Sequence, residues 1–146
     1  MHFCPLDYRY GDQSFKRIWS DIGRHERQVE VERALVWAHC ELGRVSAEDY
    51  AAVEAISNPE HVRIERVAEI EAETRHDIMA LTKAMAEAAG DAGWCIHLGA
   101  TSNDIVDTAV ALQLRDSMIM LRSALCELIL VTANLAERER DTVMLG

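Results

Sequence analysis

The chain has 146 residues, of which 49% are hydrophobic and 27% are charged, which is enough for one core and close to the usual size of a single globular domain. Seven glycines and two prolines are too few turn formers for a many-stranded β fold, so a mostly helical chain is expected. A net charge of −10 argues against a nucleic-acid partner or an anionic membrane surface, although a few local cations can still hold an anionic small ligand.

The cysteines stand far apart, without a Cys-x-x-Cys pair or a zinc-like cluster, at Cys4, Cys40, Cys95 and Cys126. They indicate buried free thiols and no metal site. The chain has no basic N-terminal segment followed by an apolar run, and no stretch of about eighteen apolar residues. Neither a signal peptide nor a membrane span is expected, and a cytoplasmic location is favoured.

An extended arm is predicted over residues 1–13, because Pro5 and Gly11 flank a stretch without helical periodicity. Such an arm needs a surface to lie on. Arg9 and Tyr10 either contact that surface or belong to a solvated tail.

One long helix is predicted over Ser14–Leu42, with its first residue as N-cap and Gly43 as the glycine that ends it. Apolar residues recur at helical spacing and form its predicted core face: Phe15, Ile18, Trp19, Ile22, Val29, Leu35, Ala38 and Leu42. Both tryptophans of the segment, Trp19 and Trp37, are interpreted as packing residues. Its two histidines have no assigned role.

Two shorter helices follow. Ser46 and Asp49 resemble a capping box that opens the first, and Asn58-Pro59 closes it. The second is predicted over residues 61–74, where an apolar stripe contains Val62, Ile64, Val67 and Ile70. Its glutamates read as a solvated face: Glu60, Glu65, Glu69, Glu71 and Glu73.

Ionisable side chains crowd the junction between this helix and the next, which Thr74 can cap and which ends at Gly90. A helix start concentrates backbone donors, and histidine titrates near neutral pH, so Arg75, His76 and Asp77 are candidate functional residues. The alternative is structural: Asp77 complements the helix dipole and His76 is merely exposed.

After a predicted loop at residues 90–93, a short apolar run from Trp94 to Leu98 carries His97 and predicts a strand-like entry into a helix. Thr101 or Ser102 is the predicted N-cap, which leaves the other hydroxyl free to donate. The helix start then offers a seat for a phosphate or a carboxylate. The alternative is that both hydroxyls only cap the helix.

The last helix is predicted from Ser102 to about Arg140, without a glycine or proline. A seam of apolar residues repeats every three or four positions: Leu114, Met118, Leu121, Leu125, Leu128 and Leu135. Such a helix is about 55 Å long at 1.5 Å per residue, so it needs helices from a larger chain or from other subunits. We therefore divide the chain into an N-terminal helical domain, residues 1–110, and the truncated start of a long-helix bundle, residues 111–146.

Several short motifs, taken in order, resemble the N-terminal part of adenylosuccinate lyases, enzymes of the fumarase/aspartase superfamily. The similarity runs over nearly the whole chain. The motifs are Arg9-Tyr10-Gly11, Val29-Glu30-Val31-Glu32, residues 70–77 (IEAETRHD), residues 96–104 (IHLGATSND) and Val106-Asp107-Thr108-Ala109. Asn103 departs from the Ser or Thr that many members carry there.

The resemblance implies an all-α fold and the elimination of fumarate from adenylosuccinate, and from the succinyl-carboxamide ribotide of purine synthesis, with no metal or organic cofactor. It also implies a homotetramer whose sites use several subunits. The implied substrate-binding residues are Arg9, Tyr10, Arg75, His76, Asp77, Thr101 and Ser102, with His97 as a further candidate. His76 is the candidate catalytic residue, and the principal acid and base residues of the family lie beyond Gly146.

Two alternatives stay open at this stage. Composition and periodicity also fit a non-catalytic helical module for binding or oligomerisation, and other superfamily lyases, such as argininosuccinate lyase, share the scaffold. A pure bundle has no need of Arg75, His76, Thr101 and Ser102 around one cavity, which favours the enzyme. The 146-residue chain alone is expected to be inactive, because it lacks the complete proton-transfer groups.

Overall fold

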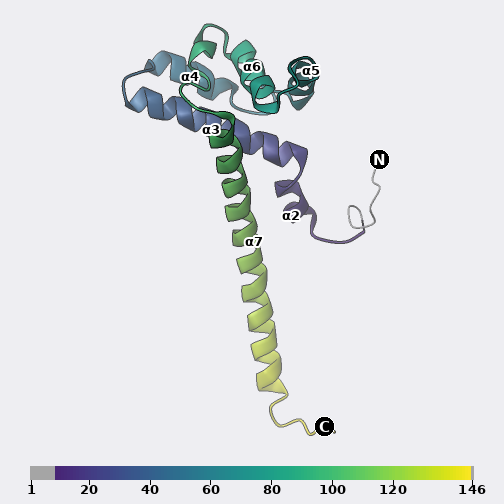
Figure 1. The fold of residues 1–146 in the computed structure, drawn as a ribbon. Helices are drawn as coiled ribbons and strands as arrows, with labels where there is room; N and C mark the ends of the chain where they lie inside the picture. The colour runs from purple at the N-terminus through teal and green to yellow at the C-terminus, as the bar shows by residue number, and fades with distance from the viewer. Residues whose placement is uncertain (1–8, 146) are drawn as a thin grey trace.

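The computed structural model describes residues 9–145, and all regular structure within them is helical. A cluster of helices sits at one end of a single long helix that projects well beyond it (Figure 1). The elements in order are α2 (Gln13–Ile18), α3 (Asp21–Glu41), α4 (Ala47–Ile56), α5 (Ile64–Thr74), α6 (Asp77–Ala89), the 3-10 helix η1 (Gly90–Cys95) and α7 (Ser102–Arg138). The predicted all-α fold class is confirmed. Residues 1–8 of the predicted arm lie outside the described residues.

The first long helix was predicted wrongly, because it is broken into α2 and α3. Asp12, and not Ser14, caps α2: its carboxylate accepts a hydrogen bond from the backbone N–H of Phe15 at 2.9 Å. Ser20 then caps α3 by accepting from the N–H of Gly23 at 3.1 Å. Helical periodicity continues through residues 19 and 20, so the apolar pattern gave no warning of the break.

Contacts with α7 hold the break in place. The side-chain amide of Gln113 donates to the carbonyl oxygen of Ile18 at 2.6 Å, at the end of α2. The indole N–H of Trp19 donates to the hydroxyl of Ser117 at 2.9 Å. These groups are far apart in sequence, so only the tertiary structure supplies partners for the interrupted helix.

The buried stripe of α3 agrees only in part with the prediction: Val29 is buried and Leu35 is partly buried, as expected. The buried side chains of the stripe are His25, Val29, Glu32, Val36 and His39, spaced three or four residues apart. Ile22 and Leu42, which were expected in the core, are 48% and 67% exposed, while Trp19 and Trp37 are 45% and 51% exposed. Polar residues occupy core positions because each has a hydrogen-bond partner across the fold.

The next three helices agree better with the sequence. The hydroxyl of Ser46 accepts from the N–H of Asp49 at 3.0 Å, as predicted for the start of α4. Helix α5 begins at Ile64, later than predicted, and its glutamates are exposed as expected. In α6, the buried side chains Ile78, Leu81 and Met85 face the core.

The run from Trp94 to Leu98 is not a strand. Residues 90–95 form η1, and residues 96–99 form a turn that leads into α7. Cys95 and Ile96 are buried in the core. A short apolar run does not distinguish a strand from other buried segments, and the described residues contain no strand with which it could pair.

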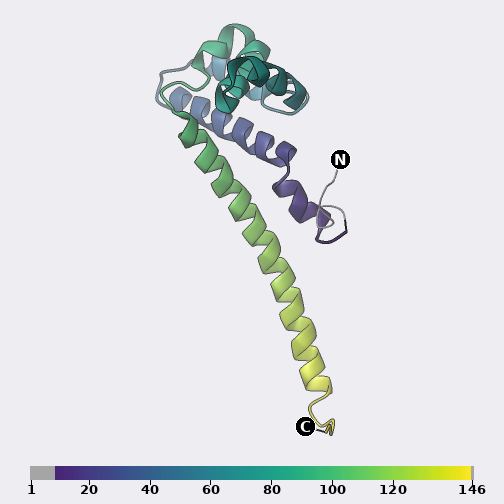
Figure 2. The same ribbon diagram turned by 45° about the vertical axis from the view of Figure 1, so that its right-hand side comes forward.

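Only the first part of α7 packs on the helical cluster, as Figure 2 shows. Its buried residues, Ile105, Ala109, Gln113 and Ser117, lie at intervals of one helical turn, and α7 contacts both α3 and α2. Arg27 of α3 adds an ion pair to Asp116 at 2.6 Å. The contact places the start of α7 beside the middle of α3.

The remainder of α7 is exposed on all sides. The predicted seam residues are between 44% and 62% exposed, and Ile129, Leu130 and Val131 are also open. By length and composition, α7 could cross a membrane, although no membrane span had been expected. A core helix of a larger helical assembly has the same composition, and Arg122 and Glu127 interrupt the apolar surface.

Candidate functional site

The junction between α5 and α6 is a sharp turn formed by Arg75 and His76. Arg75 ends α5 with a left-handed backbone, at φ +56°, and its N–H donates to the carbonyl of Glu71 at 2.8 Å. His76, and not Thr74, caps α6, because its Nδ1 accepts from the N–H of Met79 at 3.3 Å. Neutral His76 therefore carries its proton on Nε2, and its exposed side chain presents a hydrogen-bond donor.

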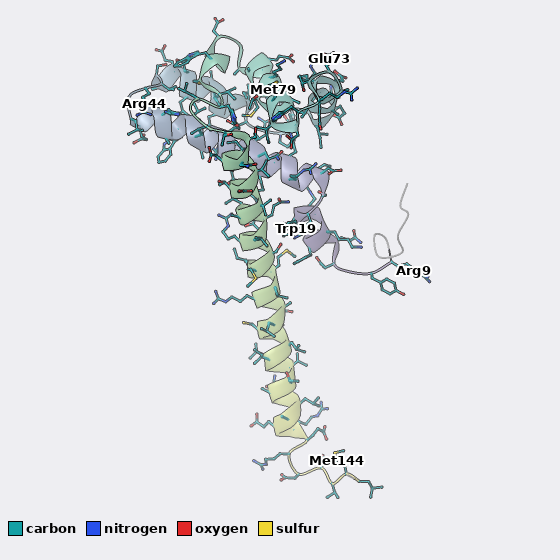
Figure 3. The ribbon with its side chains drawn as sticks, in the orientation of Figure 1. Arg9, Trp19, Arg44, Glu73, Met79 and Met144 are labelled. Atoms are coloured by element: carbon teal, nitrogen blue, oxygen red, sulfur yellow. The ribbon has the colours of Figure 1, made fainter. Side chains whose placement is uncertain are left out.

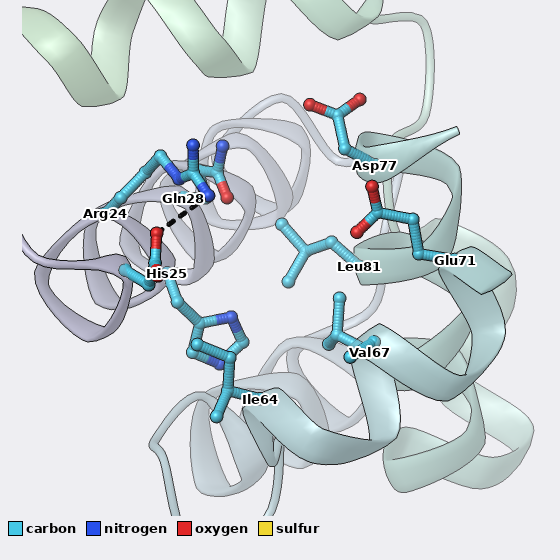
Figure 4. Close-up of a pocket in the computed structure, with 10 residues that line it drawn as sticks. Arg24, His25, Gln28, Ile64, Val67, Glu71, Asp77 and Leu81 are labelled. Carbon is cyan, nitrogen blue, oxygen red and sulfur yellow. Dashed lines mark hydrogen bonds and ion pairs between the residues drawn. The ribbon is translucent and has the colours of Figure 1, made fainter. Parts of the chain in front are cut away.

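Asp77 lines a cavity of about 330 Å³ between α3 and the α5–α6 pair (Figure 4). Three carboxylates line it, those of Asp21, Glu71 and Asp77. The only guanidinium in the lining is that of Arg24. Arg24 is already paired with Asp21 at 3.3 Å. The cavity carries net negative charge, so it suits a hydrogen-bond donor or a cation better than a phosphate.

Arg75 lies at a neighbouring surface pocket with Ala68, Glu71 and Ala72. Its guanidinium makes no ion pair within residues 9–145, so this cation is available to an external anion. The three predicted residues therefore differ in role: Arg75 offers positive charge, His76 offers an Nε2–H donor, and Asp77 faces the acidic cavity.

The start of α7 is a capped helix end. Thr101 occupies the N-cap position, and the carboxylate of Asp104 accepts from the backbone N–H of Thr101 at 2.9 Å. The predicted cap is confirmed. The hydroxyl of Ser102 has no hydrogen-bond partner in the described part of the chain, so it is free to donate to a ligand, as the sequence had suggested.

His97 precedes this helix start and is held by Glu32 of α3. The Nδ1 atom of His97 lies 2.6 Å from one carboxylate oxygen of Glu32, and the backbone N–H of His97 donates to the other at 3.1 Å. Burial raises the pKa of Glu32, and the hydrogen bonds from His97 oppose that rise. His97 also has a left-handed backbone, at φ +62°.

Arg9 and Tyr10 lie in a turn before α2 and are exposed. Figure 3 shows Arg9 beyond α2, well away from Glu73 and Met79, which flank the α5–α6 junction. No hydrogen bond or ion pair between described residues joins Arg9, the junction and the start of α7. The convergence of these three groups on one site stays a prediction.

Sequence reasoning missed Glu32 as a site residue and gave no role to His25 and His39. His25 Nε2 lies 2.7 Å from the carbonyl oxygen of Val62, and His39 Nε2 lies 2.8 Å from that of Leu98. A signal was present, because these polar residues share one helical spacing with Val29 and Val36. An ionisable residue in such a stripe is expected to have a buried partner.

The described residues contain no group of three or more His, Cys, Asp or Glu that could hold a metal ion. Cys40, Cys95 and Cys126 are free thiols, of which Cys95 is buried and Cys126 is exposed, against the expectation of burial.

The family model described as "Lyase" matches residues 7–146. Adenylosuccinate lyase of Pyrococcus abyssi is 43% identical over 142 residues, which is 97% of this chain and 32% of that protein. Adenylosuccinate lyase of Archaeoglobus fulgidus is 51% identical over 142 residues, 97% of this chain and 31% of the relative. The chain thus spans about a third of the length of the curated relatives it matches.

Two solved structures share the fold. A fumarate lyase from Mesorhizobium sp. BNC1 is similar with a TM-score of 0.84 and 30% identity over 95% of this chain and 33% of that chain. The 3-carboxy-cis,cis-muconate lactonizing enzyme from Pseudomonas putida has a TM-score of 0.87 and 30% identity, over 97% of this chain and 32% of its own. The match to the family model covers nearly every residue, and on that basis this chain belongs to the lyase family.

Proposed function

We propose that this chain is the N-terminal part of a cytoplasmic adenylosuccinate lyase, which eliminates fumarate from adenylosuccinate and from the succinyl-carboxamide ribotide of purine nucleotide synthesis. The observation that carries the proposal is the identity of 43% and 51% with adenylosuccinate lyases over 97% of the chain. The structures similar at 30% identity act, by their titles, as a fumarate lyase and a lactonizing enzyme, so the scaffold alone does not choose the substrate.

The polar groups of the site are of the kinds that can bind the anionic substrate of this reaction. Elimination removes a proton next to a carboxylate and delivers one to a leaving nitrogen, so it needs a base, an acid and donors for anionic oxygens. Arg75 offers a cation, His76 offers an Nε2–H donor, and Ser102 offers a hydroxyl at a helix start. We assign substrate binding to them together with Arg9, Tyr10, Asp77, Thr101 and His97.

Association with further helices belongs to the same proposal. The exposed apolar length of α7 has no cover within the described residues, and exposed apolar patches of this kind mark interfaces. We propose that residues 111–146 begin a helical bundle shared between subunits of a homotetramer, and that residues 1–110 form a domain on its end. Arg9 would then reach a site on another subunit.

The test is an assay of fumarate release by the full-length protein that carries this chain. Ser102→Ala is expected to lower kcat/KM for adenylosuccinate by roughly ten- to a thousand-fold, the range for loss of one positioned donor to an anionic centre. Ser46→Ala is the control, because it removes a serine hydroxyl at another helix start, where Ser46 caps α4 and lies outside the site. It is expected to cost about 1 kcal/mol of stability and to leave kcat/KM unchanged.

Turnover of argininosuccinate or 3-carboxymuconate, with no turnover of adenylosuccinate, would replace the proposed substrate. An unchanged kcat/KM in Ser102→Ala would remove that residue from the site. The 146-residue chain alone is expected to show no fumarate release, since general acid and base groups contribute about 10²–10⁴-fold each and those of the family lie elsewhere.

A further inference from the structure

We propose that Glu32 is a positioning residue of the substrate site, which clasps His97 so that only the Nε2 atom of its imidazole is left to meet the substrate. This inference rests on the proposed function for its kinetic consequence, but its geometry is independent of the substrate. Glu32 lies in the middle of α3, and His97 lies in the turn between η1 and α7. The pair therefore joins the scaffold of the fold to the start of the long helix.

Glu32 and His97 differ in how far their side chains are exposed. The side chain of Glu32 is 0% exposed, whereas that of His97 is 24% exposed. The buried carboxylate faces Nδ1 at 2.6 Å and the backbone N–H at 3.1 Å, so it binds one residue through two atoms. Because Glu32 occupies Nδ1, Nε2 is the imidazole nitrogen left to bind a ligand.

The contact between Glu32 and His97 also determines which of their atoms carry protons. When the pair carries no net charge, one proton lies between Glu32 and Nδ1, and Nε2 is protonated whichever of the two partners holds that proton. When one proton is lost, the ionised carboxylate keeps the proton on Nδ1, and Nε2 becomes a lone-pair acceptor. Nε2 is therefore a donor to an anionic oxygen in the first state and an acceptor that can serve as a base in the second.

A purely structural role for Glu32 explains less of this geometry than a positioning role does. An unpaired buried carboxylate is strongly destabilising, and a neutral residue of similar volume serves packing as well or better. The same turn is already tied to α3 by His39, whose Nε2 lies 2.8 Å from the carbonyl oxygen of Leu98. Glu32 adds to this tether a fixed tautomer and a fixed ring orientation.

Glu32→Gln in the full-length protein is the decisive variant, because it keeps the shape and changes the proton pattern. The amide has one acceptor and one donor. If its oxygen accepts from the backbone N–H of His97, its NH₂ donates to Nδ1, and the proton of neutral His97 moves to Nε2. Histidine-selective ¹⁵N NMR of the sedimented protein, with His97→Asn to assign the signals, reports which nitrogen is protonated.

At alkaline pH, where the pair has lost its shared proton, the expected spectrum of the unsubstituted protein shows neutral His97 with its proton on Nδ1 and none on Nε2. Glu32→Gln is expected to abolish this pattern. His39→Gln is the matched control, because it loosens the same turn from the same helix without touching the His97 ring, and it is expected to keep the pattern. A neutral His97 that carries its proton on Nε2 at alkaline pH in the unsubstituted protein overturns the proposal.

The kinetic arm is a double-mutant cycle on adenylosuccinate cleavage. Glu32→Gln is expected to lower kcat/KM roughly 10- to 100-fold, as for carboxylates that orient functional histidines in metal sites. In a His97→Asn background, Glu32→Gln should have almost no further effect, because Glu32 acts through that ring. Additive losses overturn the proposal. If the full-length protein does not cleave adenylosuccinate, the proposed function fails, and the NMR pattern still decides the role of Glu32.

Discussion

Three ionisable residues of α3 occupy positions where a core helix normally places apolar side chains. His25 and His39 hold the carbonyl groups of Val62 and Leu98, and Glu32 holds His97. Each therefore fixes a segment that lies outside the helices. Residue by residue, α3 serves as the scaffold on which the turn before α7 is positioned.

Gly23 is required where α2 and α3 meet. A Cβ atom there would lie 2.3 Å from the carbonyl oxygen of Arg17 and 2.6 Å from that of Ile18. Gly23→Ala is expected to lower the free energy of unfolding by about 1–3 kcal/mol, the usual cost of overpacking. In an open helix interior the same change stabilises by about 1 kcal/mol. Urea unfolding measures the difference.

Gly43→Ala is the comparison for this change. Gly43 has φ +68°, and nothing lies within 4 Å of its added Cβ, so only left-handed backbone strain of about 1 kcal/mol is expected. Gly23→Ala should be the more damaging of the two. A rise in stability for Gly23→Ala would show that the carbonyl groups of α2 do not approach α3 this closely.

At the scale of elements, α5 and α6 are held together by an exposed ion pair. Arg66 Nε lies 2.9 Å from one carboxylate oxygen of Glu87, and Nη2 lies 2.9 Å from the other. The hydrogen bonds from Arg66 lower the pKa of Glu87, and those to Glu87 and Glu69 raise the pKa of Arg66. Because two guanidinium nitrogens donate to two carboxylate oxygens, the pair has a defined orientation as well as opposite charges.

The stability from this pair depends on pH. Because the folded pKa of Glu87 is lowered, the contribution is present above the ordinary glutamate value of about 4.3 and is lost as the pH falls through the folded value. Glu87→Gln is expected to lower the thermal midpoint slightly at pH 7, and this difference should disappear in acid. Scanning calorimetry at both pH values measures it.

Glu73→Gln provides the control, because Glu73 is an exposed glutamate of α5 that forms no ion pair among the described residues. Its midpoint should follow that of the unsubstituted protein at both pH values. A difference for Glu87→Gln that persists at low pH would assign the effect to packing and not to the charge of Glu87.

At the scale of the whole molecule, the first and the later part of α7 differ in how they are packed. Its first part packs one face on α3, while its later part is largely apolar and is exposed around the whole circumference. A helix that is apolar on every side is expected to be surrounded, by protein or by lipid. Membership of the lyase family favours protein.

Leu125→Arg is therefore expected to weaken self-association of the full-length protein, because it places a charge in the predicted seam. Sedimentation velocity over a range of concentrations would show a shift toward smaller species. Asn134→Arg adds the same charge on the opposite side of α7 by helical periodicity, so it tests whether the seam is the more sensitive face. Unchanged association in Leu125→Arg, or flotation of the protein with lipid vesicles, would contradict a protein-covered seam.

The sequence by itself determined what local chemistry controls. The all-α class, the cap at Ser46, the helix end at Gly90 and the cap at Thr101 follow from turn residues, hydroxyls and spacing within a few positions. The exposed seam of α7 was also predictable, because no other segment of the chain is long enough to cover it.

Only the tertiary structure decided the break at residues 19–20, the polar stripe of α3 and the turn that replaced the predicted strand. Gln113 binds the end of α2 across nearly a hundred residues of sequence, and Glu32 is tolerated in the core because His97 meets it there. Periodicity records which residues share a helix face, but whether a polar residue can be buried depends on a partner that the fold brings to it.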